Sequence, residues 1–179
     1  MKIRMLSFFF VLVALQLSAQ TNHAQLKAAA PDTADVNSID GIISAYYQVL
    51  QGEAGARDWT RFRSLFLPSA RIDAVNYSKE GRAISRMGSL EDYIRNSDAF
   101  FRRSDYYPRE VTNQVQYYGH MAQVFSSYYA TTYFQNRSQP NRTNGVACFQ
   151  LLYFEGRWWI ANLLWNSEKA NSPVPTHLD

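Results

Sequence analysis

The chain has 179 residues, of which 46% are hydrophobic and 18% are charged. This length and composition suit one hydrophobic core, and therefore one domain. The formal net charge of +3 is modest, and the basic residues are scattered along the chain. A nucleic-acid binder normally concentrates its basic residues in a stripe, so nucleic acid is not an expected partner.

The first residues predict a secretory signal peptide over residues 1–19. Lys2 and Arg4 precede an apolar run over residues 5–17, and small residues follow up to Ala19. The apolar run is too short for a comfortable membrane span, so cleavage near Ala19 is expected. An uncleaved N-terminal anchor is the alternative. The prediction is an exported protein, periplasmic or secreted, with no stable membrane anchor after cleavage.

Cleavage and the single cysteine further define the mature protein. Loss of Lys2 and Arg4 reduces the 18 basic residues to 16, against 15 acidic residues, which leaves a net charge of +1. Cys148 is the only cysteine, so no internal disulfide can form and the stability must come from the core.

Three helices are expected early in the chain. Residues 20–35 are small and polar and predict a flexible leader. The first helix follows Ser38, and a second, short helix follows Asp58, each of which can cap a helix N-terminus. The third helix opens at Ser89 with a capping-box-like start and runs to about Arg103.

The sequence of the remaining part of the domain predicts mainly strands. The expected strands cover residues 70–75, 110–118, 122–134, 146–154 and 158–165, with a loop over 76–88, a break over 104–108 and a flexible tail over 169–179. The last two strands flank the short break Glu155-Gly156-Arg157, which predicts a tight hairpin.

Alternation along the strands assigns residues to two faces. In the strand over 122–134, one face carries Ala122, Val124, Ser126 and Tyr128, and the other carries Phe125, Tyr129 and Tyr133. In the last strand, one face carries Trp158, Ile160, Asn162 and Leu164, and the other carries Trp159, Ala161, Leu163 and Trp165. Neither face of the last strand is polar, so we expect the core to cover one face and a second subunit to cover the other.

Helices first and antiparallel strands later predict an α+β domain with helices on one face of a curved sheet. The stretches YYQVLQG…DWTRFRSLFLPSARI, YYGHMAQVFSSYYA and GVACFQLLYFEGRWWIANLLWNSE together resemble the nuclear transport factor 2-like superfamily, over about residues 36–168. This superfamily includes ketosteroid isomerases, scytalone dehydratase and polyketide cyclases. The resemblance implies a cone-shaped domain, in which three N-terminal helices cover the concave face of a curved antiparallel sheet. It specifies a fold more than a reaction.

The resemblance to ketosteroid isomerases implies three groups in a pocket between helices and sheet: a tyrosine donor, a carboxylate base and a protonated acid. Tyr46 matches the tyrosine, but Ala74 and Cys148 stand at the positions of the two acids. Asp73 is one residue from the base position and on the opposite strand face, so only a slip of one residue would restore it. Ketosteroid isomerisation is therefore not expected.

The resemblance to scytalone dehydratase and polyketide cyclases implies catalytic His and Asp side chains inside the same pocket. The histidines outside the signal peptide, His23, His120 and His177, fall in the predicted leader, a turn and the tail. No His, Asp and Glu cluster has metal-ligand spacing, so neither a metal site nor a cofactor is expected.

The resemblance implies that the pocket-lining residues bind the ligand. The expected ligand-binding residues are Tyr46, Phe62, Ser126, Tyr128, Cys148, Gln150, Trp158 and Asn162. Gln150 and Asn162 stand out, because an amide on an apolar inward face needs a hydrogen-bond partner. Each candidate has a structural alternative: Tyr46 can be a core tyrosine, Cys148 a small apolar filler and Asp73 a solvated strand-end charge.

Three functions remain open. The first is an exported, non-catalytic domain that binds a small, largely apolar molecule. The second is a lyase, isomerase or cyclase that acts on a carbonyl compound, with Asp73 as base and Tyr46 as donor. The third is a structural dimerisation module. A homodimer is expected in any case, because a row of aromatic side chains faces outward: Phe125, Tyr129, Tyr133, Trp159 and Trp165.

Overall fold

The computed structural model describes residues 31–78, 80–85, 88–135, 138–169 and 173–175. The predicted signal peptide and most of the predicted leader lie outside these residues. Within the described residues no helix is long and apolar enough to cross a membrane.

In the part of the chain that the structure describes, four helices precede or interrupt the strands. They are α1 (Thr33–Val36), α2 (Ile39–Leu50), α3 (Trp59–Ser64) and α4 (Leu90–Phe101). The three longer helices start at the predicted residues because Ser38, Asp58 and Ser89 each accept a hydrogen bond from a backbone N–H of the first turn. At α4 the Asp92 carboxylate also accepts from the Ser89 N–H, which completes a capping box.

Helix α1 differs from the prediction of a flexible leader up to residue 35. Asp32 caps this short helix by accepting a hydrogen bond from the Ala34 N–H. Asp35 is buried and forms two hydrogen bonds of 2.8 Å with the Arg61 guanidinium of α3. This bidentate ion pair fixes the segment from residue 32 onward, and its partner lies too far along the chain for local sequence to reveal it.

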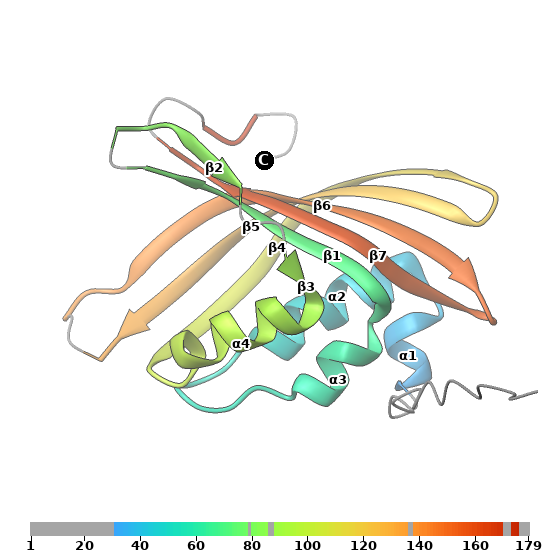
Figure 1. The fold of residues 1–179 in the computed structure, drawn as a ribbon, viewed down its shortest axis with the longest axis horizontal. Coiled ribbons are helices and arrows are strands. Elements are labelled where there is room, and N and C mark those ends of the chain that lie inside the picture. Colours follow the sequence, from blue (N-terminus) through green and yellow to red (C-terminus); the bar gives the residue numbers. More distant parts are fainter. Residues whose placement is uncertain (1–30, 79, 86–87, 136–137, 170–172, 176–179) are drawn as a thin grey trace, which may run out of the picture.

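The seven strands of the described residues form one curved sheet. They are β1 (Phe66–Tyr77), β2 (Ala83–Ser85), β3 (Gly88–Ser89), β4 (Ser104–Tyr118), β5 (Met121–Phe134), β6 (Asn141–Phe154) and β7 (Arg157–Ser167). The strand order is β2-β1-β7-β6-β5-β4, and β3 pairs with β1. All pairs are antiparallel except β1 and β7, which run parallel. Figure 1 shows the sheet with all the helices beneath one of its faces.

Each of the five predicted strands is longer than expected, and β1 and β4 replace segments expected as helix end or break. β4 begins at Ser104, so the stretch expected as a break is strand, and Pro108 lies within it. Proline is tolerated because β4 is an edge strand, which pairs on its outer side only where Tyr106 bridges to Gly52. β1 begins at Phe66, directly after α3, and β2 and β3 occupy part of the predicted loop.

The predicted hairpin forms between β6 and β7. Phe154 pairs with Arg157, and the two residues between them, Glu155 and Gly156, have φ angles of 53° and 76°. Two consecutive positive φ angles define the type I′ turn that suits the right-handed twist of paired strands.

A β-bulge at Ala161 alters which residues of β7 face the helices. Gln150 pairs with Asn162, whereas the next residue, Leu151, pairs with Ile160, so Ala161 is the extra residue. Simple alternation therefore fails beyond Ala161. Residues after the bulge change faces relative to the prediction, so that Leu163 and Trp165 share a face with Trp158 and Ile160, whereas Asn162 and Leu164 share the other face with Trp159.

The core fills the space between the helices and one face of the sheet. We call this face the inner face (Val124, Phe149 and Leu163) and the opposite one the outer face (Phe125, Cys148 and Leu164). Phe62 of α3 and Phe66 of β1 are almost fully buried, with ring centroids 4.8 Å apart. Tyr46 of α2 packs edge-on against Phe149 at 5.1 Å. This aromatic packing closes one end of the inner face.

Candidate functional site

A cavity of about 370 Å³ remains between the inner face, α2 and α4. This volume lies near the lower end of the roughly 300–1,000 Å³ that is typical of small-molecule sites. None of the side chains that line the cavity carries a formal charge at neutral pH. They are Tyr46, Tyr47, Leu50, Tyr93, Asn96, Ser97, Phe100, Phe101, Tyr106, Pro108, Tyr128, Ala130, Thr132, Phe134, Asn141, Thr143, Ala147, Trp165 and Ser167.

Besides Tyr47, four tyrosines from four different elements supply hydroxyls to a cavity lined by aromatic rings and by neutral Asn, Ser and Thr side chains. We call them the cavity tyrosines: Tyr46 of α2, Tyr93 of α4, Tyr106 of β4 and Tyr128 of β5. Burial raises the pKa of Tyr46 well above its ordinary value, and the other three cavity tyrosines and Tyr47 raise it further. Burial also raises the pKa of each of the other cavity tyrosines. All four phenols therefore stay protonated and neutral near neutral pH.

The hydroxyls of the cavity tyrosines differ in their partners. Hydrogen bonding toward Ser97 and Ser167 offsets part of the rise in the pKa of Tyr93 and of Tyr128. No hydrogen bond joins the hydroxyl of Tyr46 or of Tyr106 to another described residue. In the described part of the chain no fully buried side-chain nitrogen or oxygen lacks a partner. These two hydroxyls are therefore reached from the cavity, where they can donate to a bound molecule.

Aromatic rings form the cavity walls. Trp165 of β7 meets Tyr93 of α4 edge-on at 5.7 Å. Phe100 of α4 meets Tyr106 of β4 at 5.7 Å, again edge-on. The Ala161 bulge turns Trp165 toward α4, so the prediction that Trp165 lies at a dimer interface on the outer face is wrong.

A polar chain runs beside the cavity through the cavity-lining Tyr47. Its hydroxyl lies 2.8 Å from the Ser126 hydroxyl, which donates to a Glu110 carboxylate oxygen at 2.7 Å. The Asn113 amide donates to the same oxygen at 3.0 Å. Ser126 is fully buried, so this chain satisfies three polar groups that would otherwise destabilise the inner face. Sequence reasoning missed Glu110, because only the register of β4 against β5 brings it to Ser126.

Among the predicted ligand-binding residues, Tyr46 and Tyr128 line the cavity. Phe62 is buried in the core, where it stacks on Tyr93 at 5.4 Å. Ser126 lies behind Tyr47 in the polar chain. Trp158 is on the inner face but away from the cavity, edge-on to Tyr153 at 5.3 Å. The structure thus brings two of these five residues together at the cavity.

The other three predicted ligand-binding residues lie on the outer face, which corrects their expected inward orientation. Cys148 pairs with Phe125 and Leu164 across the sheet, and burial among them raises the pKa of its thiol. Gln150 and Asn162 are cross-strand neighbours, and the Asn162 amide donates to the Gln150 carbonyl oxygen at 2.8 Å. The Gln150 side-chain oxygen and the Asn162 NH2 group are thus partners of each other on the outer face.

Asp73 also lies away from the cavity. Its neighbour on β7 is Leu164 of the outer face, and its carboxylate accepts a hydrogen bond of 2.5 Å from the Ser85 hydroxyl of β2. Ala74 instead sits beside Trp165 on the inner face. Asp73 and Tyr46 are thus on opposite sides of the sheet, and the structure does not bring the predicted base and donor together.

The remaining predicted interface residues lie on the outer face. Phe125, Tyr129 and Tyr133 have 40%, 39% and 46% of their surface exposed. Trp159 stacks on Phe154 at 5.5 Å and is covered on its ring by the Arg157 guanidinium. In the described part of the chain no three His, Cys, Asp or Glu side chains are grouped so as to hold a metal ion.

Comparisons with solved structures identify the fold. A conserved protein from Planctomyces limnophilus superposes with a TM-score of 0.60 at 12% identity, over 73% of this chain and 93% of that chain. A nuclear transport factor 2-like superfamily protein from Salmonella enterica superposes with a TM-score of 0.56 at 15% identity, over 75% of this chain and 87% of that chain. A putative scytalone dehydratase from Novosphingobium aromaticivorans superposes with a TM-score of 0.55 at 11% identity, over 73% of this chain and 82% of that chain. No family model and no curated protein sequence matches the chain.

The chain therefore has the α+β fold of nuclear transport factor 2-like proteins, as its sequence motifs predicted. Identities this low define the fold alone, and the chemistry must be argued from the cavity.

Proposed function

We propose that this protein is an exported binding domain for a small, uncharged and largely aromatic molecule. The observation that carries the proposal is a cavity of about 370 Å³ that is lined by aromatic rings, including five tyrosines, and by no charged side chain. The proposal of export rests on the signal-peptide pattern of residues 1–19.

The lack of charge in the cavity lining selects the ligand class. An ionised ligand would lose its hydration without gaining an opposite charge, which costs several kcal/mol. A neutral ring system instead gains from contact with the aromatic walls. A carbonyl or ether oxygen on that ring system would accept a hydrogen bond from Tyr46 or Tyr106, which have no other described partner.

The enzyme alternative has less support from the geometry. General acid–base catalysis requires a group whose pKa lies near the working pH and within hydrogen-bond reach of the substrate. Burial raises the pKa of Tyr46, so this phenol is neither a base nor a ready acid at neutral pH. Asp73 contacts the outer side of the sheet. We therefore rank binding ahead of lyase, isomerase or cyclase activity.

Titration with 1-aminoanthracene, an uncharged planar fluorophore, tests the proposal. We expect saturable binding, weakened at least about fivefold by Ala130→Leu, because overpacking a filled site costs about 1–3 kcal/mol. Ala130 is buried and lines the cavity. Ala122→Leu is the matched control, because Ala122 is buried on the same face of β5 but outside the cavity lining. Unsaturable binding, or equal weakening by both variants, would refute the cavity as the site.

We also propose that the protein forms a homodimer through one part of the outer face. Phe125, Cys148 and Leu164 form a continuous row across β5, β6 and β7. Phe125, Leu152, Phe154 and Leu164 each expose 40–45% of their surface. These apolar residues lie on both sides of the polar row Gln123, Gln150 and Asn162. So many exposed apolar side chains on one face of a small protein mark a contact with another protein chain. Tyr129 and Tyr133 lie further along β5 and line a separate groove.

A further inference from the structure

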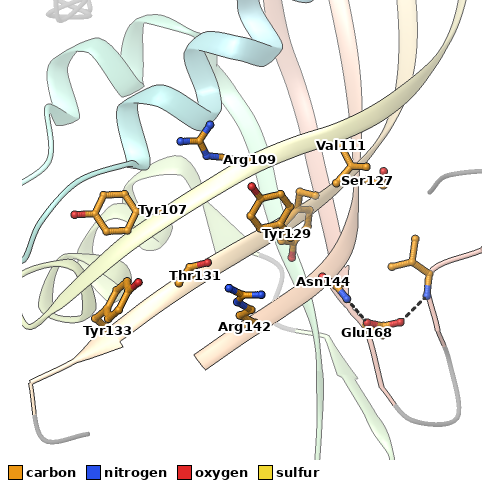
Figure 2. A pocket seen from close by; sticks show the side chains of 12 residues that line it. Tyr107, Arg109, Val111, Ser127, Tyr129, Thr131, Tyr133, Arg142, Asn144 and Glu168 are labelled. Atoms are coloured by element: carbon orange, nitrogen blue, oxygen red, sulfur yellow. Dashed lines mark hydrogen bonds between the residues drawn. The ribbon is translucent and has the colours of Figure 1, made fainter. Parts of the chain in front are cut away.

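A second hollow, of about 620 Å³, lies on the outer face, separate in chemistry from the cavity. We call it the outer groove. It is lined by Tyr107, Arg109, Val111, Ser127, Tyr128, Tyr129, Thr131, Tyr133, Arg142, Asn144, Glu168 and Val174. Figure 2 shows the groove side chains of β4, β5 and β6, with Glu168, which follows β7, hydrogen-bonded to Asn144 and to Val174.

Strand register organises the floor of the outer groove into two rows. In one row Arg109, Tyr129 and Asn144 are neighbours across β4, β5 and β6. In the adjacent row the neighbours are Tyr107, Thr131 and Arg142. The two arginines thus stand on the strands that flank β5, offset by two residues along it, which places their Cα atoms about 12 Å apart. Tyr129 and Thr131 lie between them (Figure 2).

Neither arginine of the outer groove has an acidic partner. No hydrogen bond or ion pair joins the guanidinium of Arg109 or of Arg142 to another described residue. By contrast, Arg61 and Arg63 on the helix side each hold a carboxylate with two hydrogen bonds. The two guanidinium groups of the groove therefore keep their full capacity to donate to an anion.

Aromatic and neutral polar groups complete the outer groove. Tyr129 and Tyr133 are 39% and 46% exposed, and Tyr133 packs edge-on to Tyr107 at 6.3 Å. Glu168, the one carboxylate in the lining, already accepts from the Asn144 amide at 2.6 Å and from the Val174 N–H at 3.2 Å. The lining therefore keeps a net charge of +1, with exposed rings beside the cations.

We propose that the outer groove binds a small organic anion in which a carboxylate, sulfate or phosphate group is attached to a ring. The anionic group pairs with Arg109 and Arg142, and the ring packs on Tyr129. A nucleic-acid strand fits less well, because it needs a longer basic path than two arginines provide. This ligand differs in charge from the neutral molecule proposed for the cavity, so the two proposals can fail separately.

Titration with phenyl phosphate at neutral pH and low salt tests this proposal. We expect saturable binding that weakens at least about tenfold in Arg109→Gln and in Arg142→Gln, because each substitution removes charge-assisted hydrogen bonds. Arg82→Gln is the matched control, because Arg82 is a highly exposed arginine next to β2, outside the groove. Binding of 1-aminoanthracene should be unchanged in all three variants.

Further probes test separately whether the groove recognises the anionic group and the ring of the ligand. Inorganic phosphate should bind more weakly than phenyl phosphate if the ring packs on Tyr129, and benzyl alcohol should not compete. Benzoate competition shows whether carboxylates are accepted as well. The proposal is overturned if phenyl phosphate shows no saturation by about 10 mM or if Arg82→Gln weakens binding as much as the groove variants. It is also overturned if a second copy of the chain occupies the groove, which a mass halved by Tyr129→Asp would reveal.

Discussion

At the scale of single residues, hydroxyl groups decide what the cavity can recognise. Tyr46 is 7% exposed, and its hydroxyl has no described partner. Removal of this hydroxyl should therefore cost the free protein little stability, because no internal hydrogen bond is lost. The same change should weaken only those ligands that accept a hydrogen bond from Tyr46.

A pair of probes that differ by one oxygen tests this role. We expect Tyr46→Phe to reduce the affinity for 9-fluorenone about fivefold, since one neutral hydrogen bond contributes about 1 kcal/mol. The affinity for fluorene, which lacks the carbonyl, should not change. Both affinities can be measured by displacement of 1-aminoanthracene. If Tyr46→Phe and Tyr106→Phe both leave the fluorenone affinity intact, the assignment of these donors is wrong.

The sequence predicted the position of some cavity residues but not of others. Tyr46 and Tyr128 could be placed on the inner side from helical spacing and strand alternation, and both line the cavity. Tyr106 could not, because Pro108 suggested a break and only sheet order shows that β4 is an edge strand. Cys148 and Gln150 were misplaced because the apolar residues of β6 occupy both faces, so alternation alone did not say which face is inward.

At the scale of elements, helix starts were the most predictable feature and strand faces the least. Caps are local, so Ser38, Asp58 and Ser89 marked three helix starts within the sequence itself. The bulge at Ala161 is set by pairing between β6 and β7, and it moved Trp165 from the predicted interface into the cavity wall. A single extra residue thus changed the role of every later position of β7.

The capping box of α4 makes a prediction about pH. Hydrogen bonds from Ser89 and the nearby Arg95 lower the pKa of Asp92 from 3.8 to about 2. Because the folded pKa is below the unfolded value, the contribution of Asp92 to stability is complete above the unfolded pKa and is lost as the pH falls toward 2. Urea unfolding of the wild type and Asp92→Asn should therefore differ near neutral pH and converge at about pH 2. A gap that is independent of pH would contradict this assignment.

At the scale of the whole molecule, the outer face decides the assembly state. We expect a dimer by light scattering, and we expect Leu164→Asp to dissociate it, because a charge would be buried in the apolar row. Ile84→Asp is a suitable control, since Ile84 is 40% exposed on edge strand β2, away from the row, and Leu164 is 45% exposed. A monomeric wild type, or a dimer that survives Leu164→Asp, would contradict the proposed interface.

The central claim is that the cavity holds a small neutral molecule, and native mass spectrometry tests it most directly. The mature protein would be measured under native and denaturing conditions, before and after incubation with 1-aminoanthracene. We predict one added ligand mass per chain under native conditions only, either retained from the producing cells or gained from the fluorophore, and its loss in Ala130→Leu but not in Ala122→Leu. A native mass that stays equal to the bare chains after incubation would contradict the claim.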